Sequence, residues 1–267
     1  MLDLRMAALD ALCLSDPAAK VAAVAELAVG DRPVDVVREL AEPAGVPGRP
    51  QRPQLVRPGE VAQRSVATQE GRTALLHALA HIEFNAINLA LDITWRFAGL
   101  PDEFYRDWIR VAIEEAGHFS LLRARLAELG ARYGDFPAHD GLWEMAAKTS
   151  TDLVARLALV PRTLEARGLD ASPAVRAKFA SAGDAKSAHI VDIILQDEIG
   201  HVATGNRWFR FVCARLEVDQ TQAQTTAAAR YAAPVLRGPF NLHARRAAGF
   251  SDEELQALST TFRSGPP

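Results

Sequence analysis

Two copies of a Glu-x-x-His motif contain the residues of this sequence best suited to chemistry. Glu115 and His118 form the first copy, and Glu198 and His201 form the second. Residues three apart on an α-helix lie about 60° apart around the axis and about one turn apart along it, so both side chains of a pair can reach one ion. Each copy therefore predicts half of a metal site.

A single glutamate precedes each motif at a matched distance. Glu83 lies 32 residues before Glu115, and Glu165 lies 33 residues before Glu198. Two helical hairpins that each supply one lone Glu and one Glu-x-x-His are the pattern of di-iron and di-manganese carboxylate bundles. The sequence predicts two iron ions, with manganese as the alternative, bound by Glu83, Glu115, His118, Glu165, Glu198 and His201.

Charge supports the metal interpretation. A bare carboxylate in a protein core costs several kcal/mol, and four close together would be prohibitive. Two divalent cations would balance four carboxylates, with the two imidazoles neutral. The competing interpretation is that a single Glu-x-x-His arises by chance on a solvated face, and that a buried His is an ordinary core residue. Two copies within apolar stripes, each with its own preceding Glu, favour the metal.

Other motifs are weaker. His77 and His81 lie four residues apart on the same predicted helix as Glu83 but face away from it. We expect them at the surface or as hydrogen-bond partners of the ligands. The sequence has no phosphate-binding glycine loop, nucleophile elbow or cysteine-based zinc motif.

Four long helical patterns should position the predicted ligands. Apolar residues recur at three- and four-residue spacing, without strand signals, over residues 68–97, 102–130, 142–167 and 172–217. We expect the third helix to end at Gly168 and the fourth to begin near Ser172-Pro173 and to be weak at Gly183-Asp184. Pro161 should remove a backbone hydrogen bond one turn before Glu165 and kink the third helix there.

Shorter elements flank these helices. The first forty residues read as short helices, one of them starting at Ser15-Asp16-Pro17. Residues 42–59 are rich in Pro and Gly and predict an ordered strap or a linker. The tail after Asp219 predicts one or two helices, the last opened by a capping box at residues 251–254. We expect one structural domain composed of an N-terminal part (1–67), a four-helix core (68–217) and a C-terminal extension (218–267).

Composition limits the classes of partner. A net charge of −3 and a pI near 6.2 give no bulk attraction to nucleic acid, although a local patch for tRNA stays open. Charges interrupt every apolar run, so we expect no membrane span, and the N-terminus has no signal-peptide pattern. Cys13 and Cys213 form no CxxC pair, which fits a reducing cytoplasm. The oligomeric state is left open.

Several strings in the chain are familiar. They resemble an uncharacterised bacterial ferritin-like family, known as a domain of unknown function, and more distantly the tRNA isopentenyladenosine hydroxylases. The strings are LLHALAHIEFNAINLALDITWRF, IEEAGHFSLL, GDFPAHDGLWEMA, LVPRTLEARGLD and LQDEIGHVATGNRWF. The resemblance implies an all-α, ferritin-like four-helix bundle with accessory N-terminal and C-terminal helices.

The resemblance also implies a role for the acid before each motif. In related di-iron oxygenases this acid often accepts a hydrogen bond from the ligand His of the opposite helix. Here the acids are Glu114 and Asp197, so Asp197 is expected to accept from His118 and Glu114 from His201. Glu114 departs from the more usual Asp.

The favoured function is a di-iron oxidoreductase that activates O2 to oxidise or hydroxylate an unidentified substrate, with electrons from an external donor. The alternative is a ferroxidase, a peroxide-handling protein or a manganese-catalase-like protein. A third hypothesis is a structural or binding protein with a vestigial site. Over a hundred residues outside the core favour the enzyme, as does the lack of a four-cysteine rubredoxin-like module. All six ligand positions are intact, which argues against a vestigial site.

Overall fold

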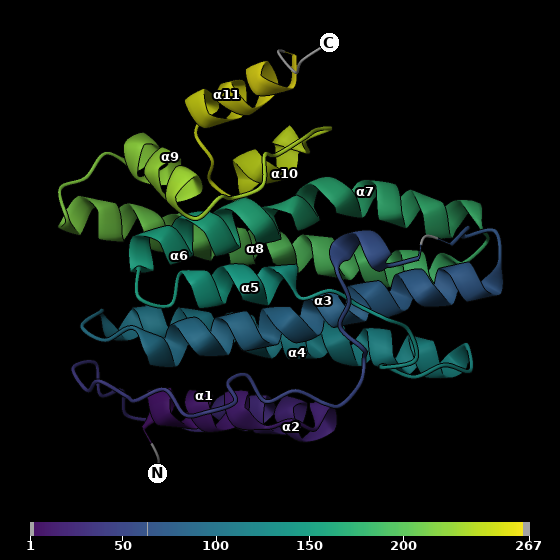
Figure 1. Ribbon diagram of the computed structural model, residues 1–267, viewed down its shortest axis with the longest axis horizontal. Helices are drawn as coiled ribbons and strands as arrows, with labels where there is room; N and C mark the ends of the chain where they lie inside the picture. The colour runs from purple at the N-terminus through teal and green to yellow at the C-terminus, as the bar shows by residue number, and fades with distance from the viewer. Residues whose placement is uncertain (1–2, 63, 264–267) are drawn as a thin grey trace. The chain divides into compact units, whose positions relative to one another are not determined.

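The computed structural model describes residues 3–62 and 64–263, and this part of the chain is helical (Figure 1). Within it the only β-type pairing is one isolated bridge, between Leu55 and Ala138. The prediction of an all-α protein is confirmed. The chain forms two compact units, Met1–Glu144 and Met145–Pro267.

The first unit is built on a hairpin of two long helices, α3 (Gln69–Arg96) and α4 (Asp102–Glu128), which pack side by side (Figure 1). Thr68 caps α3 by accepting a hydrogen bond from the backbone N–H of Gly71. Gly99, with φ of 77°, and Pro101 then separate the two helices. Both helices lie within two residues of their predicted bounds.

Helix α3 is also long and apolar enough, by length and composition alone, to cross a membrane. This differs from the expectation of no membrane span, which rested on the charges that interrupt every apolar run. However, 72% of its most apolar window is buried inside the protein. Core helices of globular proteins have the same character, so this helix is weak evidence for a membrane span.

Two short helices, α1 (Leu4–Cys13) and α2 (Pro17–Leu27), pack on α3 and α4 respectively. The predicted start of α2 is confirmed, since Asp16 accepts from the backbone N–H of Ala19 and Pro17 is the first helical residue. The fully buried Lys20 ammonium donates to the carbonyl oxygens of Leu12 and Gly48 and to the side-chain oxygen of Asn88. This ammonium ties the strap to the helices.

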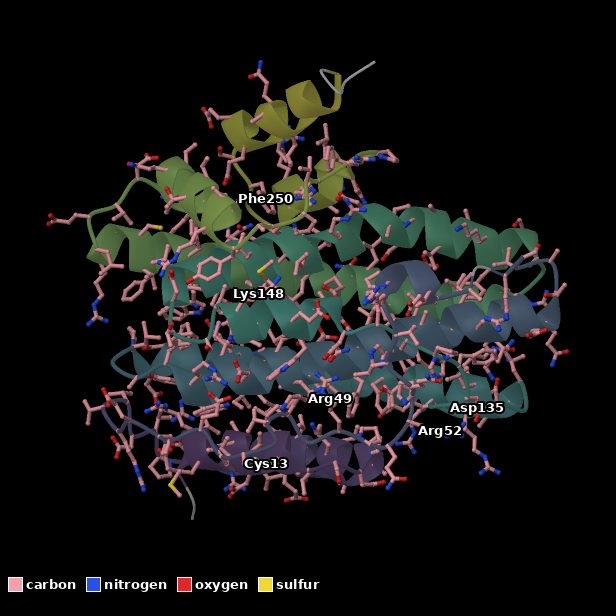
Figure 2. All side chains as sticks on the ribbon, in the orientation of Figure 1. Cys13, Arg49, Arg52, Asp135, Lys148 and Phe250 are labelled. Atoms are coloured by element: carbon pink, nitrogen blue, oxygen red, sulfur yellow. The ribbon has the colours of Figure 1, made fainter. Side chains whose placement is uncertain are left out.

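The predicted strap of residues 42–59 is ordered and contains only one turn of 3₁₀ helix, η1 (Pro58–Glu60). It pairs with the loop after α4, since Val56 N–H donates to the Ala138 carbonyl oxygen (2.8 Å). Arg49 also forms a 2.7 Å ion pair with Asp140. Figure 2 labels Arg49 and Arg52 of the strap and Asp135 of the loop.

The second unit begins at Met145, within α5 (Gly141–Lys148), and four consecutive helical segments follow α5. These are α6 (Leu153–Leu159), the π-helix η2 (Val160–Glu165), α7 (Ala166–Ser181) and α8 (Ala185–Arg215). The predicted third helix is therefore not continuous over 142–167. Its pattern contains a break at residues 149–152, where Asp152 caps α6 by accepting from Ala155 N–H (2.9 Å).

The predicted boundary between the third and fourth helices is wrong. Helix α7 continues through Gly168 and Pro173, and α8 begins only after Gly183 (φ 75°) and the capping residue Asp184. Pro173 cannot donate to the Leu169 carbonyl oxygen four residues earlier. The side-chain amide of Asn241 donates to that oxygen instead (3.2 Å), so the helix tolerates the proline.

Pro161 causes the local irregularity that was expected. The backbone around it winds as the π-helix η2, which ends at Glu165. Gly205 of α8 lies directly against the proline, because a Cβ atom at Gly205 would come 2.5 Å from Pro161 Cβ. The wide turn and the glycine together let η2 approach α8 closely.

Up to Arg263, the last described residue, the tail forms three helices rather than one or two: α9 (Gln220–Arg230), α10 (Leu242–Ala247) and α11 (Asp252–Arg263). The predicted capping box is confirmed, since the Ser251 and Glu254 side chains each accept from the other's backbone N–H. A buried cluster joins this tail to α7 and α8, and it consists of Ala166, Leu169, Val202, Ala244, Ala248, Phe250 and Leu255.

Candidate metal-binding half-sites

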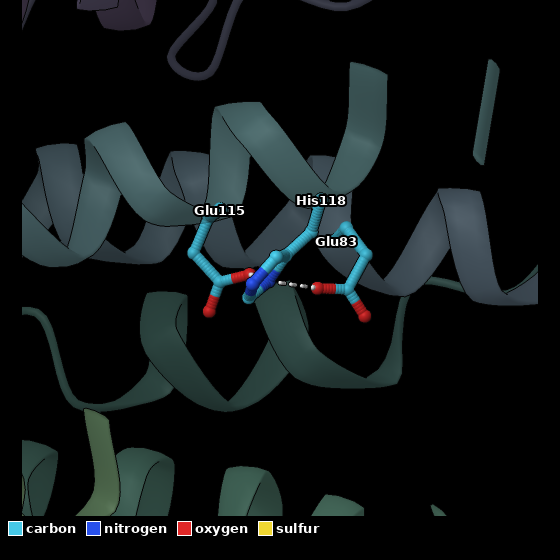
Figure 3. A group of neighbouring side chains, drawn as sticks. All are labelled: Glu83, Glu115 and His118. Carbon is cyan, nitrogen blue, oxygen red and sulfur yellow. Dashed lines mark hydrogen bonds and ion pairs between the residues drawn. The ribbon is translucent and has the colours of Figure 1, made fainter. Parts of the chain in front are cut away.

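The first unit brings together three of the predicted ligands, Glu83 from α3 and Glu115 and His118 from α4 (Figure 3). His118 Nδ1 lies 3.1 Å from Glu83 Oε2 and 3.3 Å from Glu115 Oε2. Each residue offers a ligand atom within 4.8 Å of the others, and none is more than 2% exposed. Two carboxylates and an imidazole this close and this buried can bind a divalent cation.

Aromatic residues next to these ligands fix their backbone. Phe84 and Phe119 each follow a ligand in sequence, and their ring centroids lie 5.2 Å apart across the hairpin. Tyr133 packs on both rings, at 5.5 Å from Phe84 and 5.0 Å from Phe119. This apolar packing sets the register in which Glu83 faces Glu115 and His118.

Burial and mutual contact raise the pKa values of two groups in this half-site. Burial, and next the repulsion from Glu115, raise the pKa of Glu83 to about 8. Burial alone would lower the pKa of His118, but its hydrogen bonds to Glu115 and Glu83 and their charges raise it to about 11. Glu83 and His118 thus retain protons that they would otherwise have lost at or below neutral pH. A divalent cation fits the site because its charge would replace those protons.

The second unit places Glu198 and His201 on the buried face of α8, 7% and 1% exposed, with His201 Nδ1 3.9 Å from Glu198 Oε2. Glu165 is half-buried and is the last residue of η2. Three residues later, a Cβ atom at Gly168 would lie 3.9 Å from Glu198 Cδ, so the helix that follows Glu165 runs close to Glu198. π-Helices are rare and are frequent at functional sites, which is consistent with a ligand at this turn.

Glu114 and Asp197, the acids before the two motifs, are both half-buried, on α4 and α8. The expected partner of each is a histidine of the other unit. The crossed hydrogen bonds stay a prediction.

His77 and His81 were expected either at the surface or as hydrogen-bond partners of the ligands. The surface position is wrong, because both histidines are buried. They are 0% and 5% exposed and contact the loop after α4. His77 Nε2 accepts from the Gly134 N–H (2.8 Å), and His81 Nδ1 lies 2.9 Å from the Tyr133 hydroxyl. Burial lowers the pKa of both histidines to about 4, so they are neutral at neutral pH. They anchor the loop after α4, whose Tyr133 packs beside the half-site. The sequence did not predict this role of the loop.

Comparison with known proteins gives a family but no activity. A family model described as "Protein of unknown function (DUF455)" matches residues 13–256. A protein of Haemophilus influenzae, described as uncharacterized, is 47% identical over 224 residues, which cover 81% of this chain and 78% of that protein. No solved structure matches the chain at a significant level.

Proposed function

The chain belongs to the DUF455 family, whose model covers most of its length, and we propose that it is a two-metal carboxylate enzyme that activates O2 to oxidise an organic substrate. The observation that carries the proposal is the buried group of Glu83, Glu115 and His118, in which two carboxylates lie within 3.3 Å of one imidazole nitrogen. Four-helix carboxylate proteins build their metal sites from such groups.

In this proposal the half-site of each unit completes the other within a ferritin-like four-helix arrangement. Each unit contains a helical hairpin with one lone Glu followed by one Glu-x-x-His. Six ligands would then hold two iron ions, or two manganese ions, with four carboxylate charges opposite four metal charges. The ligands would be Glu83, Glu115, His118, Glu165, Glu198 and His201.

The chain's own residues would hold and shield the centre. When bound, two iron ions would supply open coordination positions and electrons for the reduction of O2. His118 and His201 present Nδ1 toward carboxylates of their own helices, so the motif fixes which ring nitrogen is directed to the site. The buried rings of Phe84 and Phe119 would exclude water beside Glu83 and His118, which would strengthen the electrostatic interactions there.

Iron handling or peroxide removal is the alternative, because it uses the same ligands. The size of the chain outside the two hairpins favours the enzyme. Besides α1, α2 and the strap, the tail adds three helices and a large cavity that a storage protein does not need.

The test is anaerobic loading with Fe(II), metal analysis and optical detection of the reaction with O2. The enzyme should bind close to two ions per chain and react slowly with O2 until its substrate is added. Rapid formation of ferric mineral would instead select the ferroxidase. Glu115→Gln should lose metal, whereas Glu103→Gln, at an exposed position of the same helix, should retain it. A single zinc on other residues would refute the proposal.

A further inference from the structure

A cavity of about 830 Å³ lies in the second unit, bounded by η2, the end of α8, α9, α11 and the segment before α10. This volume is in the range of pockets that bind small molecules. Its lining combines apolar side chains with three arginines, Arg162, Arg210 and Arg245. Phe250, labelled in Figure 2, lies at its wall between α10 and α11.

Arg162 is 4% exposed, and its guanidinium is held on every side. Nε donates to the side-chain oxygen of Asn206 (2.6 Å), and Nη1 to that of Gln224 (3.0 Å). The plane lies over the ring of Phe209, 4.1 Å from its centroid. Nη2 donates to the carboxylate of Glu254 on α11. The guanidinium is therefore preorganised, and the position that the Glu254 carboxylate occupies suits the acid of a ligand, a carboxylate or a phosphate.

The other two arginines of the cavity differ in how far nearby carboxylates neutralise them. Arg245 is neutralised by Asp170, which accepts from its Nε (2.9 Å) and Nη2 (2.7 Å). Arg210 donates to the carbonyl oxygen of Gly249 and, among the described residues, forms no ion pair with a carboxylate. Of the cavity's other acids, Asp219 caps α9 by accepting from Gln222 N–H, and Glu253 is exposed at the start of α11. Arg162 and Arg210 together thus have one directly bonded carboxylate, that of Glu254.

We propose that this cavity binds an organic anion, with its acidic headgroup on Arg210 and Arg162 and its apolar body against the walls. In the structure the Glu254 carboxylate contacts Arg162 as the acid of such a ligand would, so it competes with the ligand for this guanidinium. Apolar walls suited to the body of the ligand come from α8, the turn after it, α9 and α11, and they include Ala214, Val218, Ala228 and Leu258.

A pair of fluorescent probes with the same rings tests the role of the charge. Anilinonaphthalene sulfonate carries an acidic group, whereas phenylnaphthylamine lacks it. We expect the sulfonate to bind the full-length protein at one site per chain, roughly tenfold more tightly than the neutral probe, because a charge-assisted hydrogen bond is worth about that factor. Equal affinities would overturn the assignment of an anion site.

Four variants locate the site. Arg210→Gln should weaken the sulfonate roughly tenfold and leave the neutral probe unchanged. Arg207→Gln, an exposed arginine one turn earlier on α8, should change neither affinity. Glu254→Gln should tighten the sulfonate, because glutamine retains the capping box but not the competing charge. Ala228→Trp should fill the cavity and abolish binding of both probes while the far-ultraviolet circular dichroism is retained. Sulfonate binding that survives Ala228→Trp, or that responds equally to the changes at Arg210 and Arg207, would refute the proposal.

Discussion

Glu83, a proposed metal ligand, shows at the residue scale how such a residue can destabilise the metal-free protein. Its pKa is raised from 4.5 to about 8 by burial and by Glu115. A group with a raised pKa in the folded state contributes stability that is fully present below the unfolded value. This contribution is lost as the pH rises through the folded value. The metal-free protein should therefore lose stability between about pH 4.5 and 8, and His118, whose pKa is also raised, adds a loss of the same sign above pH 6.5.

Glu83→Gln should remove the first of these losses, because glutamine resembles the protonated acid. In a chelator, we expect the variant to unfold at higher urea concentration than wild type at pH 9, by roughly 2–4 kcal/mol. The two proteins should be close to equal at pH 5. Urea titrations at both pH values, with Glu103→Gln as the control, measure this. Wild type and variant with the same pH dependence would contradict the prediction.

Asp197 offers a second test at this scale. If it accepts a hydrogen bond from the ring of ligand His118, its removal should lower metal affinity roughly 10- to 100-fold without unfolding the protein. Competition with a chelator measures the affinity of Asp197→Ala. The control is Asp192→Ala on the same helix, whose carboxylate is exposed and paired with Arg176. If both variants bind metal as wild type does, the crossed arrangement is wrong.

At the scale of elements, the sequence predicted the hairpin of α3 and α4 because its signals are local. Thr68 caps the start of α3, a stripe of apolar residues runs along the helix, and Gly99-Leu100-Pro101 separates α3 from α4. The boundary between α7 and α8 could not be predicted, because Pro173 reads as a helix start. Pro173 has no N–H to donate to the Leu169 carbonyl oxygen. The side-chain amide of Asn241, more than sixty residues later in the chain, donates to it instead. Local signals fail where a distant side chain completes a backbone hydrogen bond.

The contact between η2 and α8 gives a prediction at this scale. Gly205→Ala would place a methyl group 2.5 Å from Pro161 Cβ, so η2 and α8 must separate or distort. We expect a loss of roughly 1–3 kcal/mol in the free energy of unfolding. The matched control is Gly200→Ala on the same helix, where a Cβ atom would meet no atom within 4 Å. This variant should be neutral or up to about 1 kcal/mol more stable, because alanine favours the helix. Thermal unfolding of both variants decides the matter, and equal losses would show that the close contact has no special effect.

At the scale of the whole molecule, the sequence identified the helical class and two groups of predicted ligands. The structure brings Glu83, Glu115 and His118 together in the first unit and Glu198 and His201 in the second. Spacing alone predicted that Glu83, Glu115 and His118 face the core, because residues at three- and four-residue spacing lie on the same face of a helix. The burial of His77 was not predicted, because it depends on a hydrogen bond from Gly134 across a loop. The number of helices in the tail was also not predicted. Packing on α7 and α8 stabilises α10 and α11, as the cluster around Phe250 shows, whereas α9 packs mainly on α6.

Metal removal is the prediction that involves the whole chain. A ligand that binds only the folded state adds stability of about 2.7 kcal/mol at a free concentration one hundred times its dissociation constant. Removing the metals would also leave the carboxylates to take up protons or repel one another. The metal-free protein should therefore melt at a lower temperature than the loaded protein at neutral pH. This gap should narrow toward pH 5, where protons compete with metal for the carboxylates and replace its charge. Calorimetry of both forms at pH 5 and pH 7.5 measures the gap, and His118→Ala and His201→Ala should each reduce it. Loaded and metal-free forms with equal melting temperatures at neutral pH would show that these six residues do not hold a stabilising metal centre.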